Sequence, residues 1–339
     1  MRHLDVTSGK YVELTAMRAK LLKAARDWFD ANSFTEVPCP HITGATGSCE
    51  WFPNAMPVTM YDVKGDEHGM FLRQTAQLYL EGFTHAHNRV YTIGPSFRQE
   101  RRATDRHLCE FTLIELEGRD FELPGLLSHV EGLIKAMFES AMDYGAPEKL
   151  SKFINRPFNE IKYADSLGLL RGAGYEIDNG DDFTPAQELK LCELLGGLPT
   201  FVTHFPAILN PTKEGQAIKF FSMKRDVEAD ETICADLLLP EVGEAVGSAV
   251  REGDPVVCKA QFEASIMYKH MVERGTDPNQ FSWYFEVLSK TNGKYPYPQS
   301  SGCGIGFERV VQCIMATNGE RQSIKDAIEI PRAPDFLMI

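Results

Sequence analysis

The spacing of apolar side chains along the chain predicts helices in four places. Within residues 16–33, Leu21, Ala25 and Phe29 recur at helical spacing on one face, and charged side chains lie largely opposite. The same kind of pattern predicts the other three helices, at residues 124–142, 256–273 and 307–316.

Apolar runs bounded by turn residues predict strands between these helices. Residues 89–100 and 109–118 give the two clearest strands, joined by a polar and charged loop. Pro38 and Pro40 exclude a helix in residues 34–43, which therefore suit an edge strand or an extended connector. Residues 70–82 predict a short strand entering a helix, and further strands are predicted at residues 200–206, 218–224, 233–240 and 282–288.

The order of these elements indicates an α+β fold. Antiparallel-type strands flanked by helices differ from the strand–helix alternation of a doubly wound parallel sheet. Residues 145–200 mix helix signals with Gly-rich turns, and we interpret them as an insertion or a small helical subdomain. The length of 339 residues suits either two average domains or one large domain, and 43% hydrophobic residues suffice for a sizeable core.

The composition argues against several functional classes. A formal net charge of -13 argues against a broad nucleic-acid-binding face, because phosphate contacts need many Lys and Arg side chains, but it allows one local basic pocket. The eight cysteines include no CxxC pair, so they fit neither a zinc site nor a disulfide framework. The N-terminus lacks the apolar segment of a secretion signal, and no run of eighteen apolar residues occurs. We therefore expect a soluble, reduced, cytoplasmic protein with no membrane or DNA partner.

Four arginines and a histidine gather between Arg98 and Leu108 of this acidic chain. Arg98, Arg106 and His107 could grip a phosphate, while Phe111 could stack on a base and Glu100 could accept a hydrogen bond from an exocyclic amine. Alternation along the strand that follows gives one face with Phe111, Leu113, Glu115 and Glu117, and another with Thr112, Ile114 and Leu116. The alternative is a solvated, charged hairpin at the edge of a sheet.

The segment GCGIGFER, residues 302–309, carries glycines at every second position before a predicted helix. Such glycines allow close approach of a ligand to the backbone, and an anion beside Arg309 would also feel the helix dipole. The spacing is not the GxGxxG of a dinucleotide-binding fold. A ladder of glycines that serves only packing would look the same.

Two acidic residues, Asp236 and Glu244, stand eight positions apart with a proline and a glycine between them. Two short strands could bring these carboxylates together, and two carboxylates with phosphate oxygens commonly hold Mg²⁺. The alternative is two surface acids near a turn. Together with the arginines, the aromatic side chain and the glycine ladder, they indicate an ATP site without a P-loop, since no GxxxxGK[ST] occurs in the chain.

These segments resemble, in the right order, the signature motifs of the class II aminoacyl-tRNA synthetases. Residues 34–43 look like motif 1 with Pro40 as its proline, residues 97–111 look like motif 2, and residues 302–312 look like motif 3. The likeness is closest to the asparaginyl/aspartyl subgroup and runs from about residue 15 to 334. Asparaginyl-type segments occur at residues 77–81, 201–206, 236–251 and 330–334.

The resemblance implies an antiparallel β-sheet flanked by helices, a homodimer through motif 1, and ATP and Mg²⁺ as cofactors. It implies that Arg98 bridges the substrate carboxylate and the α-phosphate, and that Asp236 and Glu244 hold the metal. Arg98 and Arg309 would be the catalytic side chains. The implied ATP-binding residues are Arg98, Glu100, Arg106, His107, Leu108, Phe111, Glu244, Gly306 and Arg309. Among them, Glu100 and Phe111 would hold adenine, Arg106 and His107 the β- and γ-phosphates, and Arg309 adenine and the γ-phosphate.

The sequence departs from the subgroup at its N-terminal end. Only about 33 residues precede motif 1, too few for the β-barrel that binds the anticodon in the asparaginyl enzymes. We therefore expect residues 1–14 to be an N-terminal extension and residues 15–339 to form a catalytic domain without an anticodon-binding domain.

The amino-acid pocket departs as well. Thr46 stands where the family has a glutamate for the substrate ammonium, and Glu50 aligns with a second glutamate further along. Gly293 lies near the position of an arginine that reads the substrate side chain, and Gln299 and Ser300 replace a Pro-His pair. A buried ammonium without a carboxylate partner is costly, so the substrate amine is either read differently or absent. The candidate substrate-binding residues are Thr46, Gln74, Gln77, Glu81, Arg98, Ser301, Gly302 and Cys303, the last as a neutral liner of the pocket.

These features leave three functional hypotheses. The first is a synthetase paralogue that adenylates an Asp- or Asn-like acid and passes the acyl group to ammonia or another small-molecule amine. The second is a stand-alone synthetase that charges tRNA through the acceptor stem alone. The third, a catalytically inactive regulatory protein, is disfavoured because a binding-only relic has no need of the metal-binding and α-phosphate-binding groups together.

Overall fold

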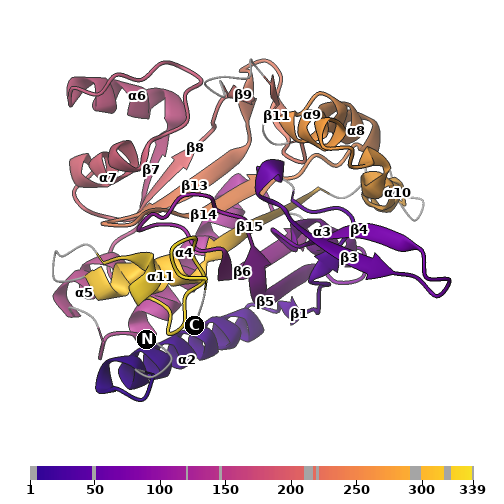
Figure 1. Ribbon diagram of the computed structural model, residues 1–339. Coiled ribbons are helices and arrows are strands. Elements are labelled where there is room, and N and C mark those ends of the chain that lie inside the picture. Colours follow the sequence, from indigo (N-terminus) through magenta and orange to yellow (C-terminus); the bar gives the residue numbers. More distant parts are fainter. Residues whose placement is uncertain are drawn as a thin grey trace.

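The computed structural model describes residues 6–47, 51–119, 121–144, 147–209, 217–218, 221–290, 299–316 and 322–337. Its centre is an eight-stranded sheet in the order β1-β5-β6-β15-β14-β13-β8-β7 (Figure 1). The neighbouring strands from β5 to β8 pair antiparallel, and only the outer pairs β1–β5 and β7–β8 are parallel. The strands are β1 (Thr35–Glu36), β5 (Arg89–Phe97), β6 (Glu110–Arg119), β7 (Asn159–Lys162), β8 (Thr200–Thr203), β13 (Cys234–Leu239), β14 (Gly243–Val250) and β15 (Ser300–Gly306). The α+β prediction is confirmed.

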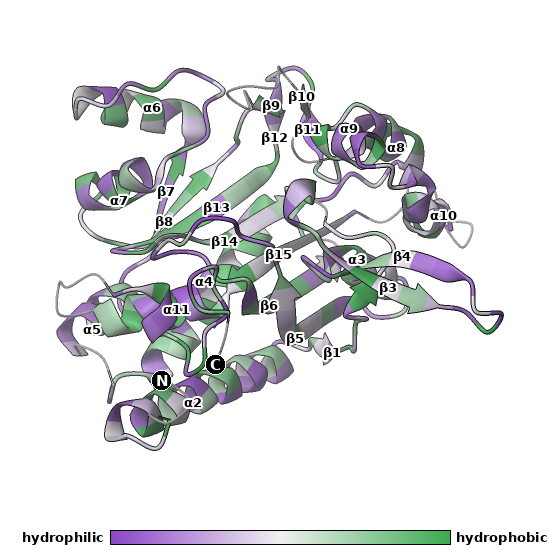
Figure 2. Ribbon diagram, in the orientation of Figure 1, coloured by the Kyte–Doolittle hydropathy of each residue, from purple (hydrophilic) through white to green (hydrophobic). Residues whose placement is uncertain are grey.

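One face of the sheet is covered by a layer of helices. These are α2 (Gly9–Ala31), α4 (Leu123–Ser140), α5 (Pro147–Ile154) and α11 (Phe307–Met315). The largest hydrophobic core lies between this layer and the sheet, where Leu21 and Ile134 of the helices join Ile114 and Leu116 of β6. Figure 2 shows hydrophilic and hydrophobic residues alternating along α2, as a helix with one buried face requires.

The first helix begins earlier than its apolar pattern predicted. Helix α2 starts at Gly9, inside the stretch 1–14 that we expected to be an extension. Tyr11 and Leu14 are buried in the same core as the rest of the helix. The stretch from residue 9 onward is therefore packed into the main hydrophobic core.

Smaller elements surround the opposite face of the sheet. A three-stranded sheet forms from β2 (Ile42–Thr43), β3 (Met56–Tyr61) and β4 (Glu67–Leu72), and it leads into α3 (Gln77–Phe83). Two short antiparallel pairs lie further along the chain, β9 (Ile208–Leu209) with β10 (Ala217–Ile218) and β11 (Arg225–Asp226) with β12 (Glu231–Thr232). Three-ten turns span Phe52–Asn54, Pro278–Phe281 and Ile324–Asp326.

The strand prediction for residues 282–288 was wrong, because this segment is helix α10 (Ser282–Ser289). Its aromatic and β-branched residues favour a strand, but Phe281, Tyr284 and Leu288 repeat at helical spacing. These three side chains are buried in a second hydrophobic cluster that includes Phe221 and Phe262. Tertiary packing against that cluster therefore overrides the local preference.

Two other predictions need smaller corrections. The single helix predicted at 256–273 is two helices, α8 (Pro255–Glu263) and α9 (Ile266–Glu273), because Ser265 caps the start of α9 by accepting a hydrogen bond from the backbone of Tyr268. In the stretch predicted as a strand at 218–224, residues 219–220 lie outside the described residues. Residues 221–224 form a turn and an isolated bridge between Met223 and Arg251.

Residues 147–200 contain three helices, and they also extend the main sheet. Besides α5, they form α6 (Tyr163–Gly172) and α7 (Pro185–Leu194). Strand β7 pairs in parallel with β8 and becomes the edge of the eight-stranded sheet. The segment is thus built into the central fold, and α7 packs against β13 and β14.

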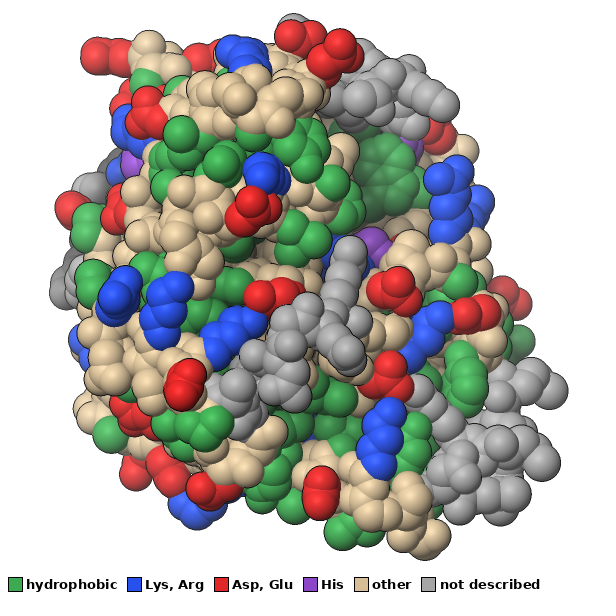
Figure 3. All heavy atoms as spheres, turned by 90° about the vertical axis from the view of Figure 1, so that its left-hand side faces the viewer, with side chains coloured by type: hydrophobic (Ala, Val, Ile, Leu, Met, Phe, Trp, Pro, Cys, Tyr) green, Lys and Arg blue, Asp and Glu red, His purple; other side chains and the backbone are tan. Residues whose placement is uncertain are grey.

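The surface agrees with the acidic composition. On the face drawn in Figure 3, Lys and Arg side chains are scattered among Asp and Glu side chains and form no broad basic area. In the part of the chain that the structure describes, no helix combines the length and the apolarity needed to cross a membrane.

Candidate active site

A cavity of about 320 Å³ opens on the face of the main sheet opposite the α2–α4 layer. It is lined by side chains of β6, β13, β14 and β15, by the loop before β6 and by the first turns of α11. Of the candidate residues, it collects Gln77, Arg98, Glu100, Arg106, His107, Leu108, Phe111, Asp236, Glu244, Gly306 and Arg309. The three separate sequence segments therefore meet at one site.

The alternation predicted along β6 holds in the structure. Phe111 and Leu113 line the cavity, and Glu115 is buried on the same side of the strand beneath α3. Ile114 and Leu116 point the other way into the helical core. The solvated-hairpin alternative does not hold, because the strand is central in the sheet, between β5 and β15.

At one end of the cavity, a basic and an aromatic side chain lie together. The Arg98 guanidinium carbon is 5.2 Å from the centroid of the Phe111 ring. Glu100, next to them, accepts a weak hydrogen bond from Asn54 Nδ2 at 3.5 Å. Burial raises the pKa of Glu100, and the Arg98 and Arg309 guanidiniums counteract the rise. An aromatic face beside an acidic acceptor and an arginine suits a purine ring with an attached phosphate.

His107 and Arg309 both line the cavity. The Nδ1 of His107 lies 2.8 Å from Thr104 Oγ1. Burial, helped by Arg309, Arg106 and Arg98, lowers the pKa of His107 to about 4, so its imidazole is neutral at physiological pH. Arg309 donates a hydrogen bond from Nη1 to the main-chain oxygen of Glu244 and lies 3.7 Å from its carboxylate. Several donors therefore converge where an anion is expected.

The two predicted metal ligands come together on neighbouring strands. Asp236 is in β13 and Glu244 is in β14, which pair antiparallel with a register shift at Leu237 and Leu238. A Cβ atom added to Gly247 would lie 3.7 Å from Asp236 Oδ1 and 3.8 Å from Glu244 Oε1, so both carboxylates face the same glycine. Within the described ranges, no group of three or more His, Cys, Asp or Glu side chains could hold a metal ion. A cation here would need oxygen ligands from a bound substrate, which fits Mg²⁺ held with phosphates.

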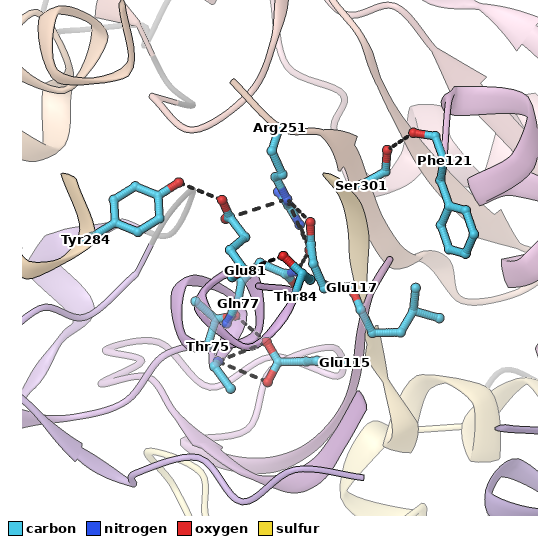
Figure 4. Close-up of polar contacts among 12 residues, drawn as sticks. Thr75, Gln77, Glu81, Thr84, Glu115, Glu117, Phe121, Arg251, Tyr284 and Ser301 are labelled. Carbon is cyan, nitrogen blue, oxygen red and sulfur yellow. Dashed lines mark hydrogen bonds and ion pairs between the residues drawn. The ribbon is translucent and has the colours of Figure 1, made fainter. Parts of the chain in front are cut away.

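The opposite end of the cavity contains an arginine that the sequence interpretation missed. Arg251, 4% exposed, lines the cavity and lies between two buried carboxylates (Figure 4). Its Nη2 is 3.3 Å from Glu117 Oε2, and its Nε is 3.7 Å from Glu81 Oε1. Arg251 is the last residue of the asparaginyl-type segment at residues 236–251, where one arginine after an apolar run was the available signal.

Both carboxylates beside Arg251 have further donors. The Tyr284 hydroxyl donates to Glu81 Oε2 at 2.7 Å, and Gln77 Nε2 donates to Glu117 Oε2. Burial and the Glu117 charge raise the pKa of Glu81 to about 8, against the lowering effects of Arg251 and Tyr284. Two acids and one guanidinium therefore share a desolvated site whose charge depends on protonation.

The Glu81 pKa predicts a specific pH dependence of stability. Between the ordinary glutamate range near pH 4.5 and about pH 8, Glu81 is protonated in the folded chain and ionised in the unfolded chain. The folded state binds more protons in this window, so the free energy of unfolding falls as pH rises through it. We expect Glu81→Gln, which cannot titrate, to gain stability relative to the wild type between pH 5 and pH 8.5 in urea unfolding.

The control for this prediction is Glu273→Gln on the exposed end of α9. This variant should follow the wild-type pH curve throughout. Parallel curves for the wild type and Glu81→Gln would contradict the protonation of Glu81 in the folded state.

Thr46 and Gln74 lie outside the cavity lining and contact each other. Thr46 is buried, and its Oγ1 accepts a hydrogen bond from the Gln74 backbone at 2.8 Å. Gln74 Nε2 donates to the Trp51 carbonyl at 3.2 Å, while Gln74 Oε1 has no hydrogen-bond partner among the described residues. Thr46 is thus engaged in holding the backbone, and the Gln74 oxygen is the acceptor available nearby. Glu50 and Gly293 lie outside the described residues.

Two candidate substrate residues on β15 face the wrong way. Ser301 donates its hydroxyl to the Phe121 carbonyl at 2.5 Å, and Cys303 is buried in the core between the sheet and α4. The expectation that Cys303 lines the pocket is therefore incorrect, because strand alternation assigns that face to the glycines. A Cβ at Gly302 would overlap the Glu117 carboxylate and the Gln77 amide, so only glycine fits there.

The chain is similar along nearly its whole length to proteins of one family. The family profile "tRNA synthetases class II (D, K and N)" matches residues 1–334. The asparagine–tRNA ligase of Lactococcus lactis subsp. cremoris is 30% identical over 351 residues, which cover 98% of this chain and 70% of that protein. The asparagine–tRNA ligase of Streptococcus sanguinis is 31% identical with the same two shares covered.

Solved structures give the same result for the fold. The crystal structure of asparaginyl-tRNA synthetase from Pyrococcus horikoshii complexed with asparaginyl-adenylate has a TM-score of 0.79 and 26% identity, covering 100% of this chain and 72% of that one. The Entamoeba histolytica asparaginyl-tRNA synthetase in complex with asparaginyl-adenylate has a TM-score of 0.77 at 24% identity, covering 98% of this chain and 69% of that one.

Proposed function

This chain belongs to the class II tRNA synthetases of the D, K and N type, and we propose that it activates an aspartate- or asparagine-like acid with ATP and transfers the acyl group to ammonia or another small amine. The family membership makes it an ATP-dependent ligase with asparaginyl/aspartyl-type adenylate chemistry. The acid, the acceptor and the individual residue roles belong to the proposal.

The observation that carries the proposal is the single cavity with two different ends. The nucleotide end has Arg98, Glu100, Phe111 and Arg309, and the other end has Arg251. An acid bound by Arg251 would direct its reacting carboxylate toward Arg98 and the α-phosphate. Holding both reactants in one cavity converts the reaction into an intramolecular step.

In the first step, an oxygen of the acid's carboxylate attacks the α-phosphorus, and the bond from that phosphorus to the β-phosphate oxygen breaks to release pyrophosphate. Arg98 would stabilise the charge that develops on the α-phosphate. Asp236 and Glu244 would hold Mg²⁺, which as a Lewis acid polarises phosphoryl oxygens. In the second step, the amine nitrogen attacks the acyl carbon, AMP leaves with the former carboxylate oxygen, and the nitrogen loses a proton.

The described side chains suit a substrate acid that also carries a second polar group and an amine. Arg251 lines the cavity and offers a guanidinium to a carbonyl or carboxylate oxygen at the end of the substrate side chain. Gln74 Oε1 lacks a partner among the described residues and lies behind the lining residue Trp51, so it could accept a hydrogen bond from the substrate ammonium only after a shift of that lining. Gln74 would then accept the ammonium hydrogen bond in place of Thr46, whose hydroxyl oxygen is already bonded to the Gln74 backbone.

Charging of tRNA is the second candidate, and the comparisons favour it in one respect. The relatives that match 98% of this chain are asparagine–tRNA ligases. The acidic surface without a broad basic area on the face of Figure 3 favours a small acceptor instead. The family is typically dimeric, and dimerisation of this chain through the segment around Pro40 is also part of our proposal.

The test is ATP–pyrophosphate exchange with a panel of acids, with and without tRNA, followed by mass spectrometry of the products. We expect aspartate- or asparagine-like acids to support exchange without tRNA, and ammonia or an amine to yield an amide and AMP. Exchange or acyl transfer that strictly requires tRNA would support the second candidate. Absence of exchange with every acid would overturn the ligase proposal.

A further inference from the structure

A glutamate from the 145–200 segment lies behind the phosphate end of the cavity. Glu188, buried in the first turn of α7, accepts at Oε2 a hydrogen bond from Arg106 Nη2 at 2.5 Å. The same oxygen accepts a hydrogen bond from the Glu244 backbone at 2.9 Å. One carboxylate oxygen thus joins the loop before β6 to the start of β14.

The local structure holds Glu188 in this position. Thr184 and Gln187 form a capping box at the start of α7, with each side chain accepting a hydrogen bond from the other's backbone. Pro185 occupies the first helical turn, where its fixed φ suits the helix. Because α7 also packs against β13 and β14, Glu188 projects from a rigid element rather than from a loop.

The backbone of β14 is adapted to this carboxylate. Gly243 has a φ of +87°, a conformation that favours glycine. A Cβ atom there would overlap Glu188 Oε2 and lie 2.9 Å from Arg106 Nη2. The glycine therefore allows the carboxylate and the guanidinium to approach the strand closely.

We propose that Glu188 is a positioning residue for ATP, which holds the Arg106 guanidinium and the Glu244 main chain in the arrangement that receives the β- and γ-phosphates. The proposal rests on the proposed function of the site. Arg106 and Glu244 line the cavity and Glu188 does not, so Glu188 acts through them and does not touch the nucleotide.

The sign of the effect follows from the geometry. A carboxylate repels phosphates, so its removal would strengthen ATP binding if repulsion were the main effect. However, a guanidinium carries five donors, and Arg106 can keep one donor on Glu188 while others face the cavity. Without Glu188, the buried Arg106, 7% exposed, loses its partner and its fixed orientation. We therefore expect weaker ATP binding.

Isothermal titration calorimetry of the full chain with ATP and with AMP, in Mg²⁺ and without the acid, tests this role. Glu188→Gln keeps the side-chain size and an acceptor oxygen but removes the charge. The affinity of Glu188→Gln for ATP should fall about tenfold, which is the usual size of the loss when a residue that supports a ligand-binding side chain is changed. Its affinity for AMP should change less than about twofold. AMP lacks the two phosphates that Arg106 would hold, so a general loss of structure would weaken both ligands.

Three further variants complete the experiment: Glu193→Gln, Arg106→Ala, and Arg106→Ala combined with Glu188→Gln. Glu193→Gln, on the exposed side of the same helix, should bind both nucleotides like the wild type. In an Arg106→Ala background, Glu188→Gln should add little further loss, because the contact with Arg106 is already absent and the glutamine oxygen can still accept the hydrogen bond from the Glu244 backbone. Three results for Glu188→Gln would overturn the positioning role. These are equal loss of affinity for ATP and AMP, unchanged affinity for ATP, and tighter binding of ATP.

The outcome is separable from that of the proposed function. If Glu188→Gln binds ATP with the same affinity as the wild type, this inference is overturned and the ligase proposal stands. A selective loss of ATP binding in Glu188→Gln, combined with no pyrophosphate exchange with any acid, supports this inference and overturns the ligase proposal.

Discussion

Arg98→Ala should lower ATP–pyrophosphate exchange by about 10³-fold, at the upper end of the loss seen when one transition-state donor is removed. Arg98 lies over Phe111 in the cavity that also contains the proposed metal ligands, between the expected positions of the two reacting groups. Its charge is needed most when negative charge develops on the α-phosphate, so the loss should appear in kcat as well as in KM. Exchange rates at saturating ATP and acid measure it.

The variant must remain folded for this result to be meaningful. Arg98→Lys keeps a positive charge without the planar fork of donors, and we expect its exchange rate to fall between those of the wild type and Arg98→Ala. Arg102→Ala, an exposed arginine in the same loop, is the matched control and should retain exchange. Wild-type exchange by Arg98→Ala would refute the role carried over from the family resemblance.

Arg251→Met should destabilise the chain by about 3–5 kcal/mol, the usual cost of removing one partner from a buried ionic group. The substitution leaves the Glu81 and Glu117 carboxyls, both essentially inaccessible to solvent, without the guanidinium that lies beside them. Protonation of the carboxyls can relieve part of this cost, so the loss should be larger at pH 8 than at pH 6. Urea unfolding at the two pH values measures both effects.

A double variant separates charge from packing. Adding Glu117→Gln to Arg251→Met removes one buried carboxylate, and we expect it to restore part of the lost stability. Arg274→Met, at an exposed position after α9, should leave the unfolding midpoint unchanged. Equal losses at pH 6 and pH 8, with no recovery in the double variant, would show that lost packing rather than buried charge is responsible.

The meeting of Arg98, Phe111 and Arg309 in one cavity was predictable because these residues lie in short continuous segments. Strand alternation alone assigned Phe111 to the cavity side of β6 and Ile114 to the core. The same rule, applied to β15, would have predicted that Cys303 faces the core, because Gly302 and Gly304 lie on the other face of the strand. The error came from assigning Cys303 to the pocket as a neutral liner without applying the alternation.

The remaining members of the site were not predictable, because their partners are distant in sequence. Arg251 contacts Glu117, which is 134 positions away, and Tyr284 contacts Glu81, which is 203 positions away. Tyr284 could not be assigned at all, because its segment was interpreted as a strand and is helix α10. Nothing local marks Glu188 as a partner of Arg106, 82 positions before it.

By itself, the sequence determined the α+β class and the family resemblance, and it predicted a phosphate-binding role for the arginine-rich segment, because periodicity and short motifs depend on residues close along the chain. Only the tertiary structure decided which charges neutralise one another. Helix α3, strand β6 and the residue that follows β14 bring Glu81, Glu117 and Arg251 into one desolvated group, and α7 sets Glu188 behind Arg106. Burial and charge pairing are properties of packed surfaces from separate elements, and no local pattern in the chain encodes them.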